Sequence, residues 1–153
     1  MMRRAGRDDI SLLVDLMDEF YAEGGYRLDR ARAAEAFAAV IGDERLGYVW
    51  VIQADQKDIG HVVLTVKYAM EYGGLIACLD DLYVMPEWRN RGLATASLLE
   101  VRTFCQEAGI RALTVEVGFE NGPAQKVYRR IGFEEAAGRQ LLDFPLAPPT
   151  HLS

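Results

Sequence analysis

The segment from residue 75 to residue 108 restricts the fold more than any other part of the sequence. An apolar run, Leu75–Val84, has strand chemistry and stops at Pro86. After a polar turn, apolar side chains recur at helical spacing from Gly92 to Ala108, which predicts a long amphipathic helix closed by Gly109. The fold must therefore accommodate a strand that leads through a basic turn into a helix.

Similar patterns assign the rest of the chain. Helices are predicted from about residue 10 to Glu23, from about Asp29 to Ile41, and from Asn121 to Gly132. Further strands are predicted at 48–52 and 60–66, which form a hairpin around the polar turn 55–58, at Leu113–Val117, and after Phe133, where they include Leu141–Phe144. This order predicts a mixed α/β sheet with helices on both faces.

Length and hydropathy predict a single cytoplasmic domain. A chain of 153 residues is one domain long. We expect the domain to span 1–146 and a frayed tail, 147–153, to follow at Pro148–Pro149. No apolar run approaches the roughly 20 residues that cross a bilayer, and the first nine residues turn polar where a signal peptide would turn apolar. We therefore expect no membrane partner.

Charge and cysteine content exclude several functions. The net charge of −6 and the pI of about 4.9 argue against a general nucleic-acid binder and suit a cationic small molecule. The two cysteines, Cys78 and Cys105, lack the spacing of a zinc or redox site, and His61 and His151 are the only histidines. We expect no metal, and both cysteines are interpreted as small buried hydrophobic residues.

The turn between the strand and the long helix is suited to a diphosphate. The first N–H groups of a helix have no internal partner and lie at the positive end of its dipole. Small residues at Gly92 and Ala94 would let phosphate oxygens approach, and Arg89 and Arg91 would add charge. Neither a P-loop nor a dinucleotide fingerprint is present. Taken alone, the same residues are also compatible with a solvated basic turn before an ordinary helix.

Two motifs together carry a family resemblance. The first is Arg89-x-x-Gly92-x-Ala94 after the Asp80–Val84 strand, and the second is Asn121-x-x-Ala124-x-x-x-Tyr128-x-x-x-Gly132-Phe133. This pair resembles the GNAT superfamily of acyl-CoA-dependent N-acetyltransferases, and its central motif is similar to the diamine acetyltransferase subgroup. The resemblance implies the GNAT fold, with a central mixed, mostly antiparallel, twisted sheet of six to seven strands.

The resemblance also implies a cofactor site for acetyl-CoA as co-substrate. Backbone N–H groups of the turn would hold the CoA diphosphate, the preceding strand would pair with the pantetheine arm, and Asn121 would hydrogen-bond that arm. The implied cofactor-binding residues are Leu82, Tyr83, Val84, Arg89, Asn90, Arg91, Gly92, Leu93, Ala94, Thr95, Asn121, Ala124 and Tyr128. Taken alone, Asn121 is typical of a helix cap and Tyr128 of a core tyrosine, and only the family resemblance makes Tyr128 a catalytic candidate.

Acetyl transfer to an amine requires a proton acceptor and a proton donor. By the resemblance, Asp80 would be the carboxylate that binds the amine or accepts its proton, and Tyr128 would protonate the leaving thiolate. Successive strand residues face opposite sides, so without a bulge only one of Asp80 and Asp81 can reach the acceptor. Asp81 is expected to hydrogen-bond a neighbouring loop.

The acceptor amine is left open by the sequence. Aromatic and acidic residues of the first helices and of the hairpin region would suit a cation; these are Glu19, Tyr21, Glu23, Tyr26, Tyr68, Glu71 and Tyr72. A polyamine, an aminoglycoside, an amino acid and a peptide amine all remain candidates. A CoA-binding sensor without transfer and a nucleotide-binding enzyme are the alternatives. Dimerisation through the last strands is common in the family, so a homodimer also stays open.

Overall fold

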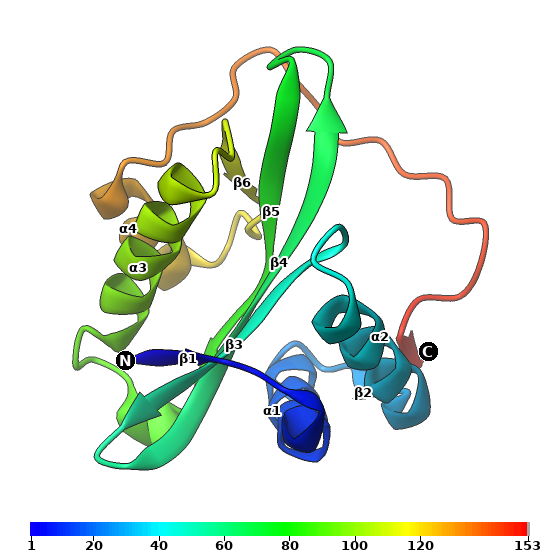
Figure 1. Ribbon diagram of the computed structural model, residues 1–153, viewed down its shortest axis with the longest axis vertical. Coiled ribbons are helices and arrows are strands. Elements are labelled where there is room, and N and C mark those ends of the chain that lie inside the picture. Colours follow the sequence, from blue (N-terminus) through cyan, green and yellow to red (C-terminus); the bar gives the residue numbers. More distant parts are fainter. Residues whose placement is uncertain (153) are drawn as a thin grey trace.

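The computed structural model describes residues 1–152, which form a five-stranded sheet with helices on both faces (Figure 1). The strand order is β1–β3–β4–β5–β6, with β1 at Met2–Arg4, β3 at Gly47–Ala54, β4 at Lys57–Ala69, β5 at Gly74–Val84 and β6 at Leu113–Val115. All neighbours are antiparallel except β5 and β6, which are parallel. The mixed, mostly antiparallel sheet is confirmed, although it has five strands instead of the expected six to seven.

The centre of the sheet is a meander of β3, β4 and β5. Asp55 and Gln56 join β3 to β4 with positive φ values of 48° and 62°, as the twist of a two-residue hairpin favours. The hairpin predicted from the sequence is confirmed, and its strands are longer than the apolar runs. At Gly60 the strands approach so closely that a Cβ atom would lie 2.1 Å from the Tyr83 carbonyl oxygen, so only glycine fits there.

Two pairs of helices cover the two faces of the sheet. α1 (Ile10–Glu23) and α2 (Arg30–Gly42) pack on one face, which we call the α1–α2 face, through a core that includes Leu13, Phe37 and Val63. α3 (Leu93–Glu107) and α4 (Gly122–Ile131) lie on the other, the α3–α4 face (Figure 1). The core of that face contains Leu98, Val101 and Cys105 of α3 and residues of β3, β4 and β5. The predicted helices and their placement on both faces are confirmed.

The chain after α4 differs from the sequence expectation. Residues 133–150 contain no helix or strand, so the strand predicted at Leu141–Phe144 is wrong. Leu142 and Phe144 are 83% and 87% exposed. Pro145, Pro148 and Pro149 cannot donate to a ladder, and the short edge strand β6 offers little to pair with. Strand prediction from an apolar run fails here because no partner strand lies beside it.

Several short elements depend on contacts between distant parts of the chain. β7 (His151–Leu152) pairs with β2 (Arg27–Leu28) in a separate two-stranded sheet, so the end of the expected frayed tail is paired (Figure 1). Short 3-10 turns precede α1 at Arg7–Asp9 and follow β5 at Pro86–Trp88. Among residues 1–152, no helix is both long enough and apolar enough to cross a membrane.

Candidate active site

The strands β5 and β6 separate where the sequence predicts the pantetheine arm. They pair only at Ala77–Leu79 with Leu113–Val115, and β5 continues to Val84 after β6 has ended. The Met85 N–H donates to the Ile59 carbonyl at 2.8 Å, so by alternation Tyr83 pairs with β4 while the backbone groups of Leu82 and Val84 point away from it. This side of β5 is an open strand edge in the described part of the chain.

A β-bulge interrupts β5 at Asp80. Val63 of β4 lies opposite Asp81, and the next residue, Leu64, lies opposite Leu79, which leaves Asp80 as the extra residue. Leu79 packs into the α3–α4 core, whereas Val63 packs into the α1–α2 core. Asp80 and Asp81 therefore both face the α1–α2 side. The sequence analysis expected only one of them to face the acceptor side, on the condition that the strand contains no bulge.

The two carboxylates have different surroundings. Asp81 is buried, and its Oδ2 lies 3.1 Å from Nε2 of His61 on β4, so its partner is a strand residue and not the expected loop. Asp80 is exposed at the surface. Loss of surrounding water raises the pKa of Asp80, with a smaller contribution from the charge of Asp81, while Thr65 and Cys78 lower it. Asp80 is thus the more accessible of the two carboxylates.

The turn before α3 presents backbone N–H groups. Asn90 and Gly92 have φ values of 62° and 78°, and alternating backbone conformations of this kind form concave anion sites. The first turn of α3 contains no acidic residue. A Cβ at Gly92 would meet nothing within 4 Å, so glycine is favoured there by its positive φ and not by lack of space. This geometry fits a diphosphate, as the sequence predicts.

The two arginines of the turn make contacts outside the helix terminus. Nη2 of Arg89 lies 2.6 Å from Oε2 of Glu23 on α1, and Nε donates to the Val84 carbonyl at 2.8 Å. Arg91 lies 4.6 Å over the Trp88 ring and donates to the Glu87 carbonyl. The two arginines that the sequence assigns to the phosphate site therefore already contact other groups of the protein.

The second motif forms α4. Asn121 caps this helix, because its Oδ1 accepts a hydrogen bond from the Ala124 N–H at 3.3 Å. Tyr128 packs edge-on against Phe133 and joins the α3–α4 core, as do Leu82 and Ala94. Burial raises the pKa of the Tyr128 phenol, so this side chain stays protonated at neutral pH. Residues of both sequence motifs thus pack against the same hydrophobic core.

The expected acceptor residues fall into two groups. Glu19, Tyr21 and Glu23 lie on α1, where Tyr21 is close enough to Asp80 and Asp81 for their charges to raise its pKa, after burial as the main cause. Tyr68, Glu71 and Tyr72 lie around the tip of the long β4–β5 hairpin, far from α1 (Figure 1). The structure thus favours the α1 group. Tyr26 packs against His151 of β7.

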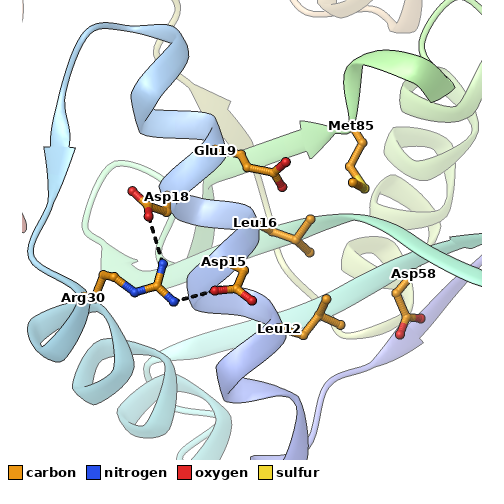
Figure 2. Close-up of a pocket in the computed structure, with 8 residues that line it drawn as sticks. All are labelled: Leu12, Asp15, Leu16, Asp18, Glu19, Arg30, Asp58 and Met85. Carbon is orange, nitrogen blue, oxygen red and sulfur yellow. Dashed lines mark hydrogen bonds and ion pairs between the residues drawn. The ribbon is translucent and has the colours of Figure 1, made fainter.

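A surface pocket of about 450 Å³ lies beside α1 (Figure 2). It is lined by Leu12, Asp15, Leu16, Asp18, Glu19, Arg30, Asp58 and Met85. Arg30 bridges Asp15 and Asp18. Asp80 is not among the residues that line this pocket, whereas Glu19 of the α1 group is. Among residues 1–152, no cluster of His, Cys, Asp and Glu could hold a metal ion.

The open edge of β5 and the backbone amides of the turn before α3 are suited to an extended, phosphate-bearing ligand. Residues 11–133 match the family model described as "Acetyltransferase (GNAT) family". Because this match spans most of the chain, the protein belongs to the GNAT acetyltransferase family. It is an acyl-CoA-dependent N-acetyltransferase with acetyl-CoA as co-substrate, which confirms the sequence prediction.

Three similar proteins illustrate the relationship. The integron cassette protein HFX_CASS3 from the mobile metagenome of Cole Harbour Salt Marsh has a crystal structure that matches with a TM-score of 0.88 and 43% identity, covering 97% of this chain and 92% of that one. The "Uncharacterized N-acetyltransferase YhfO" of Bacillus subtilis is 23% identical over 90% of this chain and 91% of its own length. An "Aminoglycoside N(6')-acetyltransferase type 1" of Stenotrophomonas maltophilia is 28% identical over 62% of this chain and 64% of its own length.

The raised pKa of Asp80 has a consequence for stability. An ionised Asp80 is less favourable in the folded chain than in the unfolded chain, so it opposes folding above its unfolded pKa, and this effect disappears as the pH falls below that value. We predict that Asp80→Asn raises the thermal unfolding midpoint at pH 7 and that the gain shrinks towards about pH 4. Calorimetry at both pH values measures it, with Asp143→Asn as the exposed control. A lower midpoint at pH 7 would contradict the prediction.

The phosphate turn predicts opposite effects on stability and on binding. Thr95 is in the first turn of α3, where a new carboxylate would stabilise the helix by about 0.3–1 kcal/mol but repel a diphosphate. We predict that Thr95→Asp keeps or raises the free energy of unfolding and weakens acetyl-CoA binding by about tenfold or more, which corresponds to about 1.4 kcal/mol. Calorimetric titration measures it against Thr95→Asn, the neutral match. Equal affinities for these two variants would refute the assignment of the turn.

Proposed function

We propose that this enzyme transfers the acetyl group of acetyl-CoA directly to a small cationic primary amine, within a ternary complex. The observation that carries the proposal is the bulge at Asp80, which turns a carboxylate with a raised pKa towards α1 beside the open edge of β5. The net charge of −6 favours the approach of a cation. One relative is named as an aminoglycoside acetyltransferase, and aminoglycosides carry several primary amines.

The chain's own groups would hold the co-substrate along the edge of β5. The amides of Gly92, Leu93 and Thr95 would bind the diphosphate, and the free backbone groups of Leu82 would pair with the pantetheine arm. The Asn121 amide N–H₂ can donate to that arm while its Oδ1 caps α4. A backbone N–H near Leu82 would polarise the thioester carbonyl; one such donor is typically worth about 2.7–4 kcal/mol of barrier.

The transfer requires two proton movements. The amine nitrogen forms a bond to the thioester carbon, the carbon–sulfur bond breaks, and the amine loses one proton while the thiolate gains one. Asp80 would accept the amine proton, directly or through an ordered water, because its raised pKa makes it a better base than an ordinary Asp. Tyr128, whose raised pKa keeps it protonated, would supply the proton to the sulfur.

The cysteines support direct transfer over an acyl-enzyme. Burial raises the pKa of Cys105 to about 11, and it also raises the pKa of Cys78. Both groups therefore remain thiols at neutral pH, and a thiol is a far weaker nucleophile than a thiolate. A covalent route through cysteine is accordingly disfavoured.

A panel of amines tests the proposed acceptor class. The enzyme is incubated with acetyl-CoA and an aminoglycoside, a polyamine, free amino acids or lysine-containing peptides, and release of free thiol is followed. We expect turnover with an aminoglycoside or a polyamine. Turnover with peptides alone would refute a small acceptor. Acetyl-CoA binding without thiol release from any amine would support a CoA sensor. Stabilisation by ATP but not by CoA in a thermal-shift assay would support a nucleotide enzyme.

Removal of the Tyr128 hydroxyl tests the proposed acid. We predict that Tyr128→Phe binds acetyl-CoA with unchanged affinity and lowers kcat by roughly a hundred- to ten-thousand-fold, the usual range for a lost general acid. Steady-state kinetics with the best amine and calorimetric binding measure the two quantities. Tyr48→Phe, which removes a hydroxyl on β3, is the control and should leave kcat unchanged. Equal kcat values for Tyr128→Phe and the parent would remove Tyr128 from the mechanism.

A further inference from the structure

A buried histidine lies beneath the bulge and has no role in the steps described above. His61 on β4 is fully buried, and its ring lies between Phe20, Phe37 and Tyr83, with centroid distances of 6.4, 6.0 and 6.2 Å. Its Nε2 lies 3.1 Å from Asp81 Oδ2. Among residues 1–152, its Nδ1 has no hydrogen-bond partner. A buried polar side chain in an aromatic cage requires an explanation.

The two ring nitrogens indicate which form of the imidazole is present. A protonated ring would carry N–H groups on both nitrogens, and the one on Nδ1 would be buried without an acceptor. A neutral ring with its proton on Nε2 donates to Asp81 and leaves only a lone pair on Nδ1. With its proton on Nε2, the ring can donate to the Asp81 carboxylate across the two strands.

The pair lies beside the irregularity in the β4–β5 ladder. His61 is opposite Tyr83, and Asp81 is the residue immediately after the unpaired Asp80. At a bulge the ladder no longer fixes the direction of each side chain by itself. The hydrogen bond from His61 draws the Asp81 side chain into the interior between β4 and α1, while the adjacent Asp80 remains exposed. One cross-strand bond thus distinguishes two consecutive carboxylates.

We propose that His61 is a positioning residue for the acetyl transfer: it holds the charged Asp81 carboxylate inward, and the pair thereby fixes the orientation and the electrostatic surroundings of Asp80. This inference rests on the proposed function of Asp80. The groups facing Asp80 are Thr65 of β4, Cys78 and Asp81 of β5, and Tyr21 of α1; Glu116, after β6, acts on Cys78. Asp81 is the charged group nearest to Asp80 along the chain.

The charge of Asp81 determines the expected direction of change. Asp81 raises the pKa of Asp80, so loss of that charge must lower it. Asp81→Asn removes the charge and keeps an oxygen for His61. His61→Phe leaves the buried Asp81 carboxylate without its donor, which disfavours the charged form of that carboxylate. His61→Gln can restore an N–H donor at the position of Nε2.

Carboxyl-carbon NMR titration of the enzyme without acetyl-CoA or amine tests the inference independently of catalysis. We expect the Asp80 titration midpoint to fall in Asp81→Asn and in His61→Phe, and to stay near the parental value in His61→Gln. With acetyl-CoA and the best amine, kcat should fall by about tenfold or more in the first two variants and recover in His61→Gln, while the Kd for acetyl-CoA stays unchanged. Nitrogen NMR of the parent should show the His61 proton on Nε2.

A packing control separates positioning from stability. Phe37→Leu disturbs the same aromatic cage without touching the hydrogen bond. It should lower the unfolding midpoint and leave the Asp80 titration unchanged. If Asp81→Asn and His61→Phe behave as Phe37→Leu does, His61 is structural and the inference is overturned. If His61→Phe does not fold, Asp81→Asn and His61→Gln still decide. A parent enzyme that acetylates no amine would refute the proposed function, whereas the Asp80 titration would still report the influence of the pair.

Discussion

Backbone hydrogen bonding along the edge of β5 is the constraint on which the site depends. β6 pairs with only three residues of β5, so the remaining length of β5 has polar groups on one side and no neighbouring strand in residues 1–152. If β6 continued beside β5, the backbone groups of Leu82 would form hydrogen bonds to it. Here they are available to a ligand that can itself supply amides. The early end of β6 thus leaves these backbone groups free of a neighbouring strand.

The bulge at Asp80 determines which side of the sheet the two carboxylates face. In a regular strand Asp80 and Asp81 would face opposite sides of the sheet. The extra residue at the bulge lets both carboxylates lie on the α1–α2 side, and His61 hydrogen-bonds to the buried one. The result is one exposed and one buried carboxylate at adjacent positions. The bulge and the cross-strand hydrogen bond together explain why two adjacent aspartates differ in burial.

Local periodicity was enough to predict the parts of the fold that depend on neighbours in the sequence. The long helix after Gly92, the hairpin at Asp55 and the cap at Asn121 are all confirmed. Local periodicity could not predict features that depend on residues distant in the sequence. These are the register shift at Asp80, the hydrogen bond from His61 to Asp81, and the pairing of β2 with β7. The run at Leu141 shows the reverse error, because strand-forming residues form no strand without a partner.

The contacts of Arg89 join the two halves of the candidate site. One guanidinium donates to the Val84 carbonyl, pairs with Glu23 at the end of α1 and lies 5.5 Å over the Tyr83 ring. Glu23 and Arg89 are 66 positions apart in the sequence, yet this side chain holds the first helix against the turn that precedes α3. Any sliding of α1 across the sheet must break an ion pair, a hydrogen bond and a ring contact together. Arg89 therefore adds a direct link between the end of α1 and the turn before α3 to the apolar packing that already holds α1 on the sheet.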